Sequence, residues 1–369
     1  MAVNRQAPRS ISRRRRRHAA DLPIPRSTDP TGIKLAATCF EPAGLTRCAL
    51  TSPDQLRDLI QVGHPVWVQI QGLHQQAEIQ AFLEALPVRS EVIPSLLEVS
   101  LASQINMDGT CVVLHLHRLL FGSHPTRLHS EQVNLLLAPN LLISLEECTK
   151  ANAFPGLNRW LDSLNPPPTA ADLDDILHFL VDELLDEVFP LLESLGDDLN
   201  RIEEQTVGNV EPSLLRRVYD LRTNLRAIKR QIWPLRQQIA LLLRRSQRLI
   251  SDEALDGFRD MAQHVEQLVD QTEMLRHQCE AITATYMANS ANRMNQVMKT
   301  LTILSSIFTP IGFIAAIYGM NFRAIPTTQQ PWGYAACLAL MTLIALLQSL
   351  YLWQRGWFED WSGGERLRR

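Results

Sequence analysis

The sequence predicts an α+β domain followed by long helices and two C-terminal transmembrane helices. Three observations support this fold class. Short apolar runs alternate with helical periods up to about residue 165, helical spacing alone follows from residue 170, and two uncharged segments lie near the C-terminus. The 369-residue chain has a net charge of -3 and a mean hydropathy of -0.08. These averages exclude a disordered chain and a carrier with many membrane spans.

Residues 1–31 are expected to form a disordered basic tail. The run Arg13–Arg17 lacks the following apolar stretch that a secretory or twin-arginine signal needs. The alternative is a patch for nucleic acid or anionic lipid. Nothing downstream supports nucleic-acid binding, so no nucleic-acid partner is expected.

An α/β domain is predicted over residues 32–165. Four apolar runs indicate strands: Val66–Ile70, Thr110–His117, Val133–Leu137 and Leu141–Leu145. The last two are separated by the turn sequence Ala138-Pro-Asn and are expected to form an antiparallel hairpin. Two segments have helical apolar spacing: Gln75–Leu86 and Asn152–Leu164.

This domain offers weak candidates for chemistry. His115 and His117 lie two residues apart on a predicted strand and share a face, a spacing that suits zinc. No third ligand accompanies them, so a structural role is favoured. The six cysteines are scattered without a close pair, and no G-x-S-x-G, Walker A or H-E-x-x-H motif is present. The sequence therefore predicts no enzyme.

Residues 170–299 are predicted to form a stalk of long helices. Ala170–Gln205 has an acidic polar face, and Pro190 is expected to bend it. The next helix opens with basic residues, so the two helices are expected to pack antiparallel with complementary charge. Solvated faces without such pairing are the alternative.

Helical spacing then continues towards Tyr318. Without a break, a helix starting at Ser213 would be on the order of 150 Å long. Pro234 and Ser251 are the expected points of interruption. Such a helix cannot be the core of a compact domain, so it needs helical neighbours or copies of itself.

Two uncharged segments, residues 300–319 and 334–353, predict transmembrane helices. Each is close to the roughly 20 residues that cross a bilayer as a helix. Aromatic residues flank both segments, as is typical of membrane interfaces. The alternative is a buried hairpin of a soluble protein, which the lack of a polar face disfavours.

The basic residues near these segments predict their orientation. Arg293 and Lys299 precede the first span and Arg355 follows the second, whereas the loop 320–333 carries only Arg323. Positive charge gathers on the cytoplasmic side. We therefore expect an inner-membrane protein with both termini in the cytoplasm, including residues 354–369.

The first span carries a stripe of polar and small residues on an otherwise apolar helix. Such a stripe permits close helix packing in lipid or lines a water-filled path in which oxygen atoms replace ion hydration. One helix cannot enclose a path, so the pore interpretation, which we favour, requires an oligomer. Steps of three and four residues define the stripe: Asn295, Met298, Thr302, Ser305, Thr309, Gly312, Ala316 and Gly319.

The residues just past this span match a known signature. Tyr318-Gly-Met-Asn-Phe322, together with Asn295–Thr302, Ile307–Ile317 and Trp332–Tyr334, resembles the CorA-type magnesium and divalent cation transporter family. The resemblance implies a homopentameric funnel with a cytoplasmic α+β domain, in which the first span lines the pore and the second forms an outer ring. It also implies uptake of Mg2+, with Co2+ or Ni2+ accepted, without a prosthetic group.

The resemblance assigns roles to single residues. Gly319, Met320 and Asn321 would form the outer selectivity site, where neutral Asn321 amide oxygens hold Mg2+ through its water shell. Asn295 would form a second such ring near the inner end. Hydrophobic residues there would close the path by dewetting. These residues are Met298 and Leu301.

Two departures from the family pattern affect the expected behaviour. Residues 323–331 carry no carboxylate and one positive charge, so we expect weak attraction of Mg2+ and a shallow ionic-strength dependence of flux. Members sense cytoplasmic Mg2+ at carboxylates, for which Asp260 and Glu98 are the candidates here. The usual acidic pair is not evident, and Asp260 as an ordinary surface aspartate is an equal alternative.

The sequence therefore predicts a pentameric Mg2+ channel driven by the membrane potential. Its rival within the superfamily is a zinc transporter of the ZntB type, with or without proton coupling, although Met320 favours the magnesium group. A rival from another class is a membrane-anchored helical sensor or scaffold. An anchor would tolerate Asn321→Ala, whereas a channel would lose selectivity.

Overall fold

The computed structural model divides the chain into two compact units, Met1–Thr283 and Ala284–Arg369, with the division inside helix α8 (Asp252–Tyr318). The expected basic tail, with Arg13–Arg17, lies outside the described residues. The described residues are 33–41, 44–72, 76–98, 100, 102–107, 109–121, 128–147, 152–163, 172–208, 211–245, 249–320 and 330–358.

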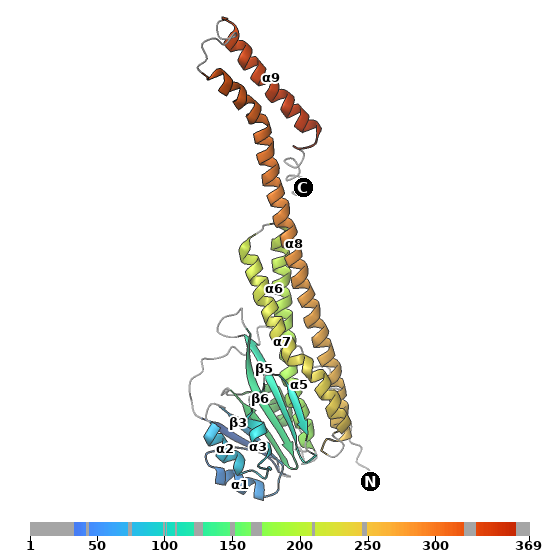
Figure 1. Ribbon diagram of the computed structural model, residues 1–369. Helices are drawn as coiled ribbons and strands as arrows, with labels where there is room; N and C mark the ends of the chain where they lie inside the picture. The colour runs from blue at the N-terminus through green and yellow to red at the C-terminus, as the bar shows by residue number, and fades with distance from the viewer. Residues whose placement is uncertain are drawn as a thin grey trace. The chain divides into compact units, whose positions relative to one another are not determined.

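The first unit is built on a seven-stranded sheet of order β2-β1-β3-β7-β6-β5-β4 (Figure 1). β3 and β7 pair in parallel, and the other described pairs are antiparallel. The predicted hairpin of β6 and β7 is confirmed, and Asn140 in its turn has a φ of 59°, which asparagine tolerates. The strands are β1 (Lys34–Glu41), β2 (Gly44–Leu50), β3 (Val66–Gln71), β4 (Gln104–Met107), β5 (Val112–Phe121), β6 (Leu128–Ala138) and β7 (Leu141–Glu146).

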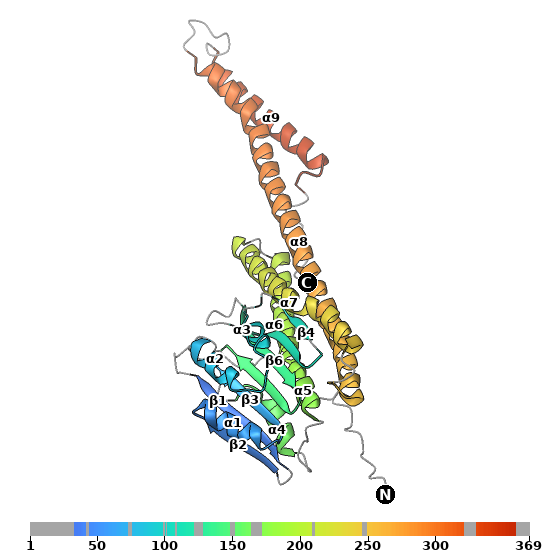
Figure 2. The ribbon, with the colours of Figure 1, turned by 60° about the horizontal axis from the view of Figure 1, so that its bottom comes forward.

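Helices cover both faces of this sheet. Side chains alternate between the two cores along each strand, so that Leu135 faces one core and Leu136 faces the other. Burial on both faces explains why the central strands read as nearly continuous apolar runs. One face is covered by α1 (Pro53–Gln61), α2 (Gln76–Glu84) and α3 (Val92–Leu97) (Figure 2).

The other face packs against the long helices. The predicted acidic helix is divided at Glu187, and Pro190 lies in the first turn of the second part, where a missing N–H removes no helical hydrogen bond. The expected bend is thus a break between two helices. The helices of this layer are α4 (Pro155–Ser163), α5 (Leu173–Asp186), α6 (Val188–Gly208), α7 (Pro212–Arg245) and the first part of α8.

Of the two expected interruptions further along the stalk, one is confirmed and one is wrong. α7 ends at Arg245 and α8 begins at Asp252, with the Ser251 hydroxyl accepting the Ala254 N–H at 3.2 Å as a helix cap. Pro234, in contrast, lies inside the continuous helix α7. Its neighbours Ile232 and Leu235 are buried in the helical core, and this packing holds the helix together across the proline.

The basic helix α7 finds its carboxylate partners on α8, whereas the sequence pointed to the acidic helix. Among the described residues, each step of seven residues along α7 is matched by a step of seven back along α8. This is the register of an antiparallel coiled coil. The pairs are partly exposed, so each contributes at most about 1 kcal/mol and serves chiefly to fix the register. They are Arg222–Glu280 (3.4 Å), Lys229–Glu273 and Arg236–Glu266 (2.8 Å).

Several carboxylates meet where α5 and α8 begin. The Asp174 carboxylate accepts the Ser251 N–H at 2.6 Å and the Asp175 N–H at 3.1 Å. Burial raises the pKa of Asp175 to about 7, and the nearby charges of Asp174, Asp172 and Glu253 also raise it. The folded protein therefore holds a proton on Asp175 more tightly than the unfolded chain does.

We expect Asp175→Asn to stabilise the protein at pH 8 and to change its stability little at pH 4. An aspartate in the unfolded chain titrates near pH 3.9, so ionisation of Asp175 costs stability as the pH rises from about 4 to about 7. Asparagine stays neutral and removes this cost. Melting temperatures of the full chain in detergent at both pH values test this, with the exposed Asp197→Asn on α6 as control. An equal gain at both pH values contradicts it.

Candidate functional site

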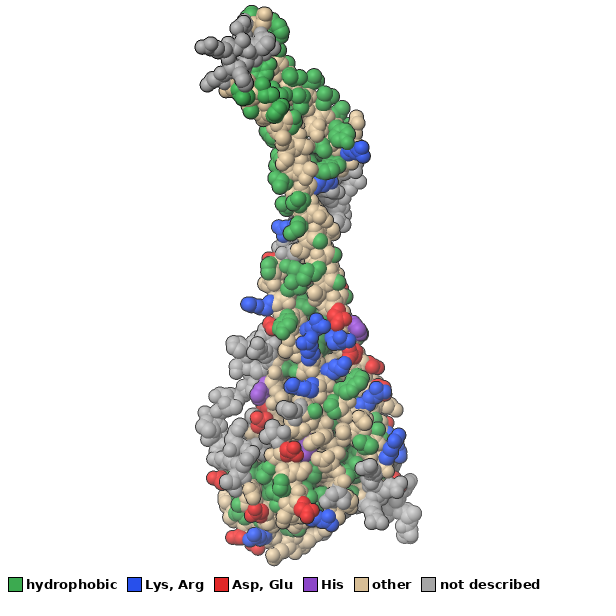
Figure 3. All heavy atoms as spheres, in the orientation of Figure 1, with side chains coloured by type: hydrophobic (Ala, Val, Ile, Leu, Met, Phe, Trp, Pro, Cys, Tyr) green, Lys and Arg blue, Asp and Glu red, His purple; other side chains and the backbone are tan. Residues whose placement is uncertain are grey.

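The second unit contains the C-terminal part of α8 and helix α9 (Gly333–Gln354). Both helices are long and apolar enough to cross a membrane. Hydrophobic side chains gather over this part of α8 and over α9 (Figure 3). Exposed side chains of this kind are typical of a surface that contacts lipid or other apolar partners.

One face of α8 packs against α9. The Gln348 amide of α9 donates a hydrogen bond to the Ser306 hydroxyl of α8 at 3.3 Å. The half-buried residues of α8 between Ile303 and Tyr318 all lie on one face of the helix. A covered row at steps of three and four runs along this face and consists of Ile303, Ile307, Pro310, Ile314 and Tyr318, with Ser306 and Ile311 half-buried beside it.

The predicted polar stripe lies on the opposite face of α8. At about 100° per residue, Thr302, Thr309 and Ala316 fall on the side of the helix away from Ile307. All of the predicted pore-lining positions are exposed in the chain: Asn295, Met298, Leu301, Thr302, Ser305, Thr309, Gly312 and Ala316. The second helix thus covers the apolar face and leaves the stripe open.

The stripe presents oxygen atoms and open space. The Thr302 hydroxyl donates its hydrogen to the Met298 carbonyl at 2.8 Å, so what it offers outward is the lone pairs of its oxygen. Apart from the neighbouring residues and backbone of α8 itself, no described atom lies within 4 Å of the position that a Cβ of Gly312 would occupy. At the inner end, the apolar side chains of Met298 and Leu301 are 56% and 57% exposed. Oxygen lone pairs suit hard cations such as Mg2+.

The end of α8 adds an electrostatic feature that was not predicted from the sequence. The helix ends at Tyr318 without a basic residue in its last turn, and the Gly319 N–H bonds the Ala315 carbonyl at 2.9 Å. The carbonyl end of a helix carries about half a negative charge. Gly319 and Met320 follow this end directly and are exposed, whereas Asn321 lies outside the described residues. The sequence signal for this feature was the point at which the helix ends relative to the motif Gly319-Met320-Asn321.

The comparison with protein families decides the identity of this arrangement. The CorA-like Mg2+ transporter protein family matches residues 63–355. The chain belongs to this family. The cobalt/magnesium transport protein CorA of Thermotoga maritima is 31% identical over 293 residues, which are 79% of this chain and 83% of the relative. CorA-family proteins are transporters, which confirms that the chain is not an enzyme.

Solved structures share the fold. The complete CorA magnesium transporter from Methanocaldococcus jannaschii superposes with a TM-score of 0.72 at 19% identity, covering 88% of this chain and 98% of the other. The ZntB cytoplasmic domain from Vibrio parahaemolyticus gives 0.56 at 16% identity, covering 71% and 100%. The predicted fold class of an α+β domain, long helices and two C-terminal apolar helices is confirmed. Identities this low show the fold and do not choose between magnesium and zinc.

The predicted regulatory carboxylates of this CorA-family chain lie in different layers. Asp260 is exposed on α8, which packs on one face of the sheet. Glu98 is exposed at the end of α3, which covers the other face. One chain therefore does not bring them together. Within the described part of the chain, no three His, Cys, Asp or Glu residues form a group that could hold a metal.

The histidine pair of the CorA-family sheet is held by hydrogen bonds. His115 Nδ1 donates to the Asn134 side-chain oxygen at 3.0 Å, and His117 Nε2 donates to the Ser100 carbonyl at 3.0 Å. Burial lowers the pKa of both rings, which keeps them neutral. These contacts agree with the structural role favoured from the sequence.

Proposed function

We propose that this CorA-family chain forms a homopentameric channel that carries Mg2+, and also Co2+ or Ni2+, into the cell across the inner membrane. The exposed polar stripe of α8, opposite the face that α9 covers, is the observation that carries the proposal. The partners are further copies of the chain, the bilayer and divalent cations. Both termini would lie in the cytoplasm.

The stripe requires several copies of the chain. A single copy of α8 lines only one side of a path. α9 packs on the opposite face of α8 and does not line the path. Further copies of α8 with their stripes turned to a common axis supply the remaining walls. The small side chains of Gly312 and Ala316 leave room at this axis for an ion with its water.

The ion would move through neutral ligands. Mg2+ dehydrates reluctantly, so amide and hydroxyl oxygens bind its water shell without holding it too tightly to release. The carbonyl ends of α8 beside Gly319 would attract cations to the outer entrance, which matters because the following loop lacks carboxylates. A membrane potential of 100 mV supplies about 4.6 kcal/mol for a divalent ion. Met298 and Leu301 would form the hydrophobic gate.

A regulatory role of cytoplasmic Mg2+ belongs to the same proposal. Asp260 and Glu98 occupy different layers of one chain, so a shared ion would need these carboxylates from neighbouring subunits. An ion held between subunits would favour one arrangement of the assembly over another. No resident prosthetic group is needed for this scheme.

Flux of ions into liposomes tests the proposal and its rivals. We expect Mg2+ to enter liposomes that contain the full chain, driven by an inside-negative potential and without a pH gradient. Asn321→Ala should reduce the preference for Mg2+ over monovalent cations, because the ring of amide oxygens is lost. Flux of Zn2+ alone that depends on a pH gradient would favour a zinc transporter, and absence of any flux would favour an anchor.

A further inference from the structure

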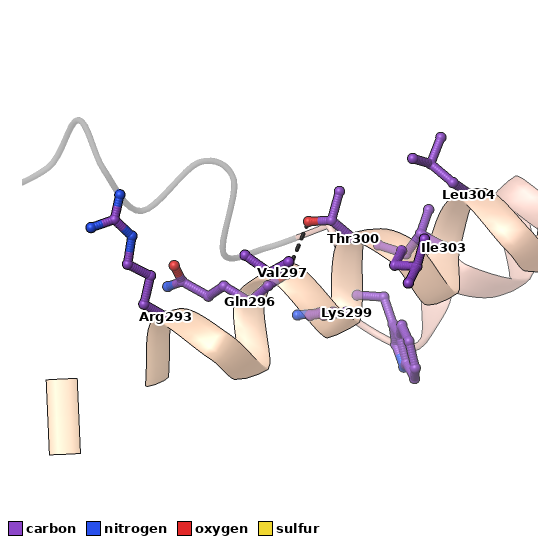
Figure 4. A pocket seen from close by; sticks show the side chains of 9 residues that line it. Arg293, Gln296, Val297, Lys299, Thr300, Ile303 and Leu304 are labelled. Atoms are coloured by element: carbon purple, nitrogen blue, oxygen red, sulfur yellow. Dashed lines mark hydrogen bonds between the residues drawn. The ribbon is translucent and has the colours of Figure 1, made fainter. Parts of the chain in front are cut away.

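The pocket of about 510 Å³ at the inner end of the predicted first span does not suit a cation (Figure 4). Arg293 and Lys299 line it, and its described lining includes no acidic residue, histidine or cysteine. A cation site outside the predicted pore needs ligands that carry negative charge or can acquire it. Two cysteines of the first unit meet this condition.

Cys39 and Cys48 lie together on β1 and β2, at the edge of the sheet (Figure 2). In the antiparallel register Cys39 lies opposite Thr46, and Cys48 lies opposite Ala37. Both cysteines therefore face the same side of the hairpin, where they pack into one hydrophobic core. The two thiols share a hydrogen bond, and the Cys48 thiol also donates to the Ala37 carbonyl at 3.7 Å. The sequence did not show this pair, because the two residues are too far apart for a C-x-x-C pattern.

The pair has the spacing and the access that a metal ion requires. A tetrahedral ion with metal–sulfur bonds of about 2.3 Å separates its two sulfur ligands by about 3.8 Å. Thiols in hydrogen-bond contact already lie near this separation, so the strands need not move. Cys39 is 4% exposed, whereas Cys48 is half-buried and Thr46 on the same strand is exposed. An ion can therefore reach the thiols from the side of β2.

The surroundings of the pair favour a bound cation over a free thiolate. Burial, together with charges on Cys48 and Glu41, raises the pKa of Cys39 to about 11. The Cys39 thiol therefore stays protonated at neutral pH and is a poor nucleophile. A divalent cation balances the charge of two thiolates and can displace their protons. Thiolates favour Zn2+ and Co2+ over Mg2+, which prefers oxygen ligands.

We propose that Cys39 and Cys48 together bind one divalent cation of the Zn2+ or Co2+ type at this edge of the sheet. The site lies in the first unit and does not depend on the proposed channel. Within the described residues no third His, Cys, Asp or Glu completes a cluster, so water fills the remaining positions around the ion. The bound ion joins the edge strand β2 to β1 and stabilises the hairpin.

Titration of the reduced, metal-free full chain in detergent with Co2+ tests this, because thiolate ligands give bound Co2+ a charge-transfer absorption band. We expect the band to saturate at one Co2+ per chain, to disappear when Zn2+ is added and to persist in millimolar Mg2+. Cys39→Ala and Cys48→Ala should each weaken Co2+ binding at least about tenfold. Cys279→Ala is the matched control for Cys39→Ala. Burial also raises the pKa of the Cys279 thiol to about 11, but this residue lies on α8 and no cysteine contributes to its shift.

Three results would overturn the proposal. A wild-type chain that shows no charge-transfer band has no thiolate site for Co2+. A band of full strength in both Cys39→Ala and Cys48→Ala places the thiolate ligands elsewhere in the chain. An equal loss in Cys279→Ala shows that the band does not report this pair. Thermal melts by circular dichroism check that each variant folds. Because Cys48 is half-buried, Cys48→Ala still tests the site if Cys39→Ala does not fold.

Discussion

Replacing Ala316 by phenylalanine is expected to reduce Mg2+ flux at least about tenfold while the protein still folds and assembles. Ala316 is exposed on the polar stripe, on the face of α8 opposite the row that α9 covers. In an oligomer every subunit adds a phenyl ring at the same level of the path. The rings fill the space that a hydrated ion needs and make the constriction apolar, so water and the ion are excluded together.

Ala339→Phe provides the matched control, because it makes the same change on the far side of the second span. Ala339 is exposed on α9, about 180° around the helix from Gln348, which contacts α8. A phenyl ring there points into lipid and should leave flux unchanged. Both variants are compared with a Mg2+-sensitive dye in liposomes after size-exclusion chromatography. Wild-type flux through Ala316→Phe, or equal block by both variants, contradicts the pore assignment.

The position of the stripe relative to α9 could not be predicted from the sequence. The stripe itself follows from residue spacing in α8, since polar and small residues recur every three or four positions. α9, however, is apolar on all sides, so no pattern says which of its faces meets α8. The contact between Gln348 and Ser306 and the half-burial of the row at Ile307 supply this information.

In the sheet, too, some strands could be predicted from the sequence and others could not. The hairpin of β6 and β7 was predictable because both strands are apolar runs joined by a Pro-Asn turn. β2 was missed because it is an edge strand with exposed residues at Thr46 and Arg47, and its strand conformation depends on pairing with β1. Pairing partners that are distant in the chain leave no trace in local periodicity.

The ion pairs of the stalk could have been predicted from the sequence. Carboxylates of α8 recur at intervals of seven residues opposite basic residues of α7 at the same interval. A search for matching charge periods would have found this register. The acidic face of the preceding helix was the more conspicuous pattern, and proximity in the chain favoured it as the partner.

Arg118→Met is expected to cost about 3–5 kcal/mol of folding free energy, the usual result of removing one partner from a buried ion pair. The sequence suggested that this strand ends at His117, yet β5 continues to Phe121 with Arg118 inside. The Arg118 side chain is 2% exposed, and its Nε donates to the Glu187 carboxylate at 3.0 Å. One terminal nitrogen of Arg118 donates to the Ala153 carbonyl at 2.7 Å. The other terminal nitrogen lies 3.8 Å from a carboxylate oxygen of Glu146.

This arginine joins three parts of the first unit. Its guanidinium group lies where three segments meet: β5 itself, the end of β7 at Glu146, and the break between α5 and α6 at Glu187. Methionine can fill the volume but leaves both carboxylates in a site that water does not reach, without the cation that balanced them. The cost is therefore set by the buried charge rather than by lost packing.

Two comparisons separate this explanation from simple loss of contacts. Arg236→Met removes an arginine of the exposed pair with Glu266, whose side chains are 53% and 54% exposed, and should cost at most about 1 kcal/mol. Adding Glu187→Gln to Arg118→Met should recover part of the loss, because it removes one uncompensated charge. Denaturant midpoints from tryptophan fluorescence measure the effect, since Trp67 packs edge-on against Phe154, the ring beneath Arg118. If the double variant is less stable than Arg118→Met alone, buried charge is not what makes the arginine necessary.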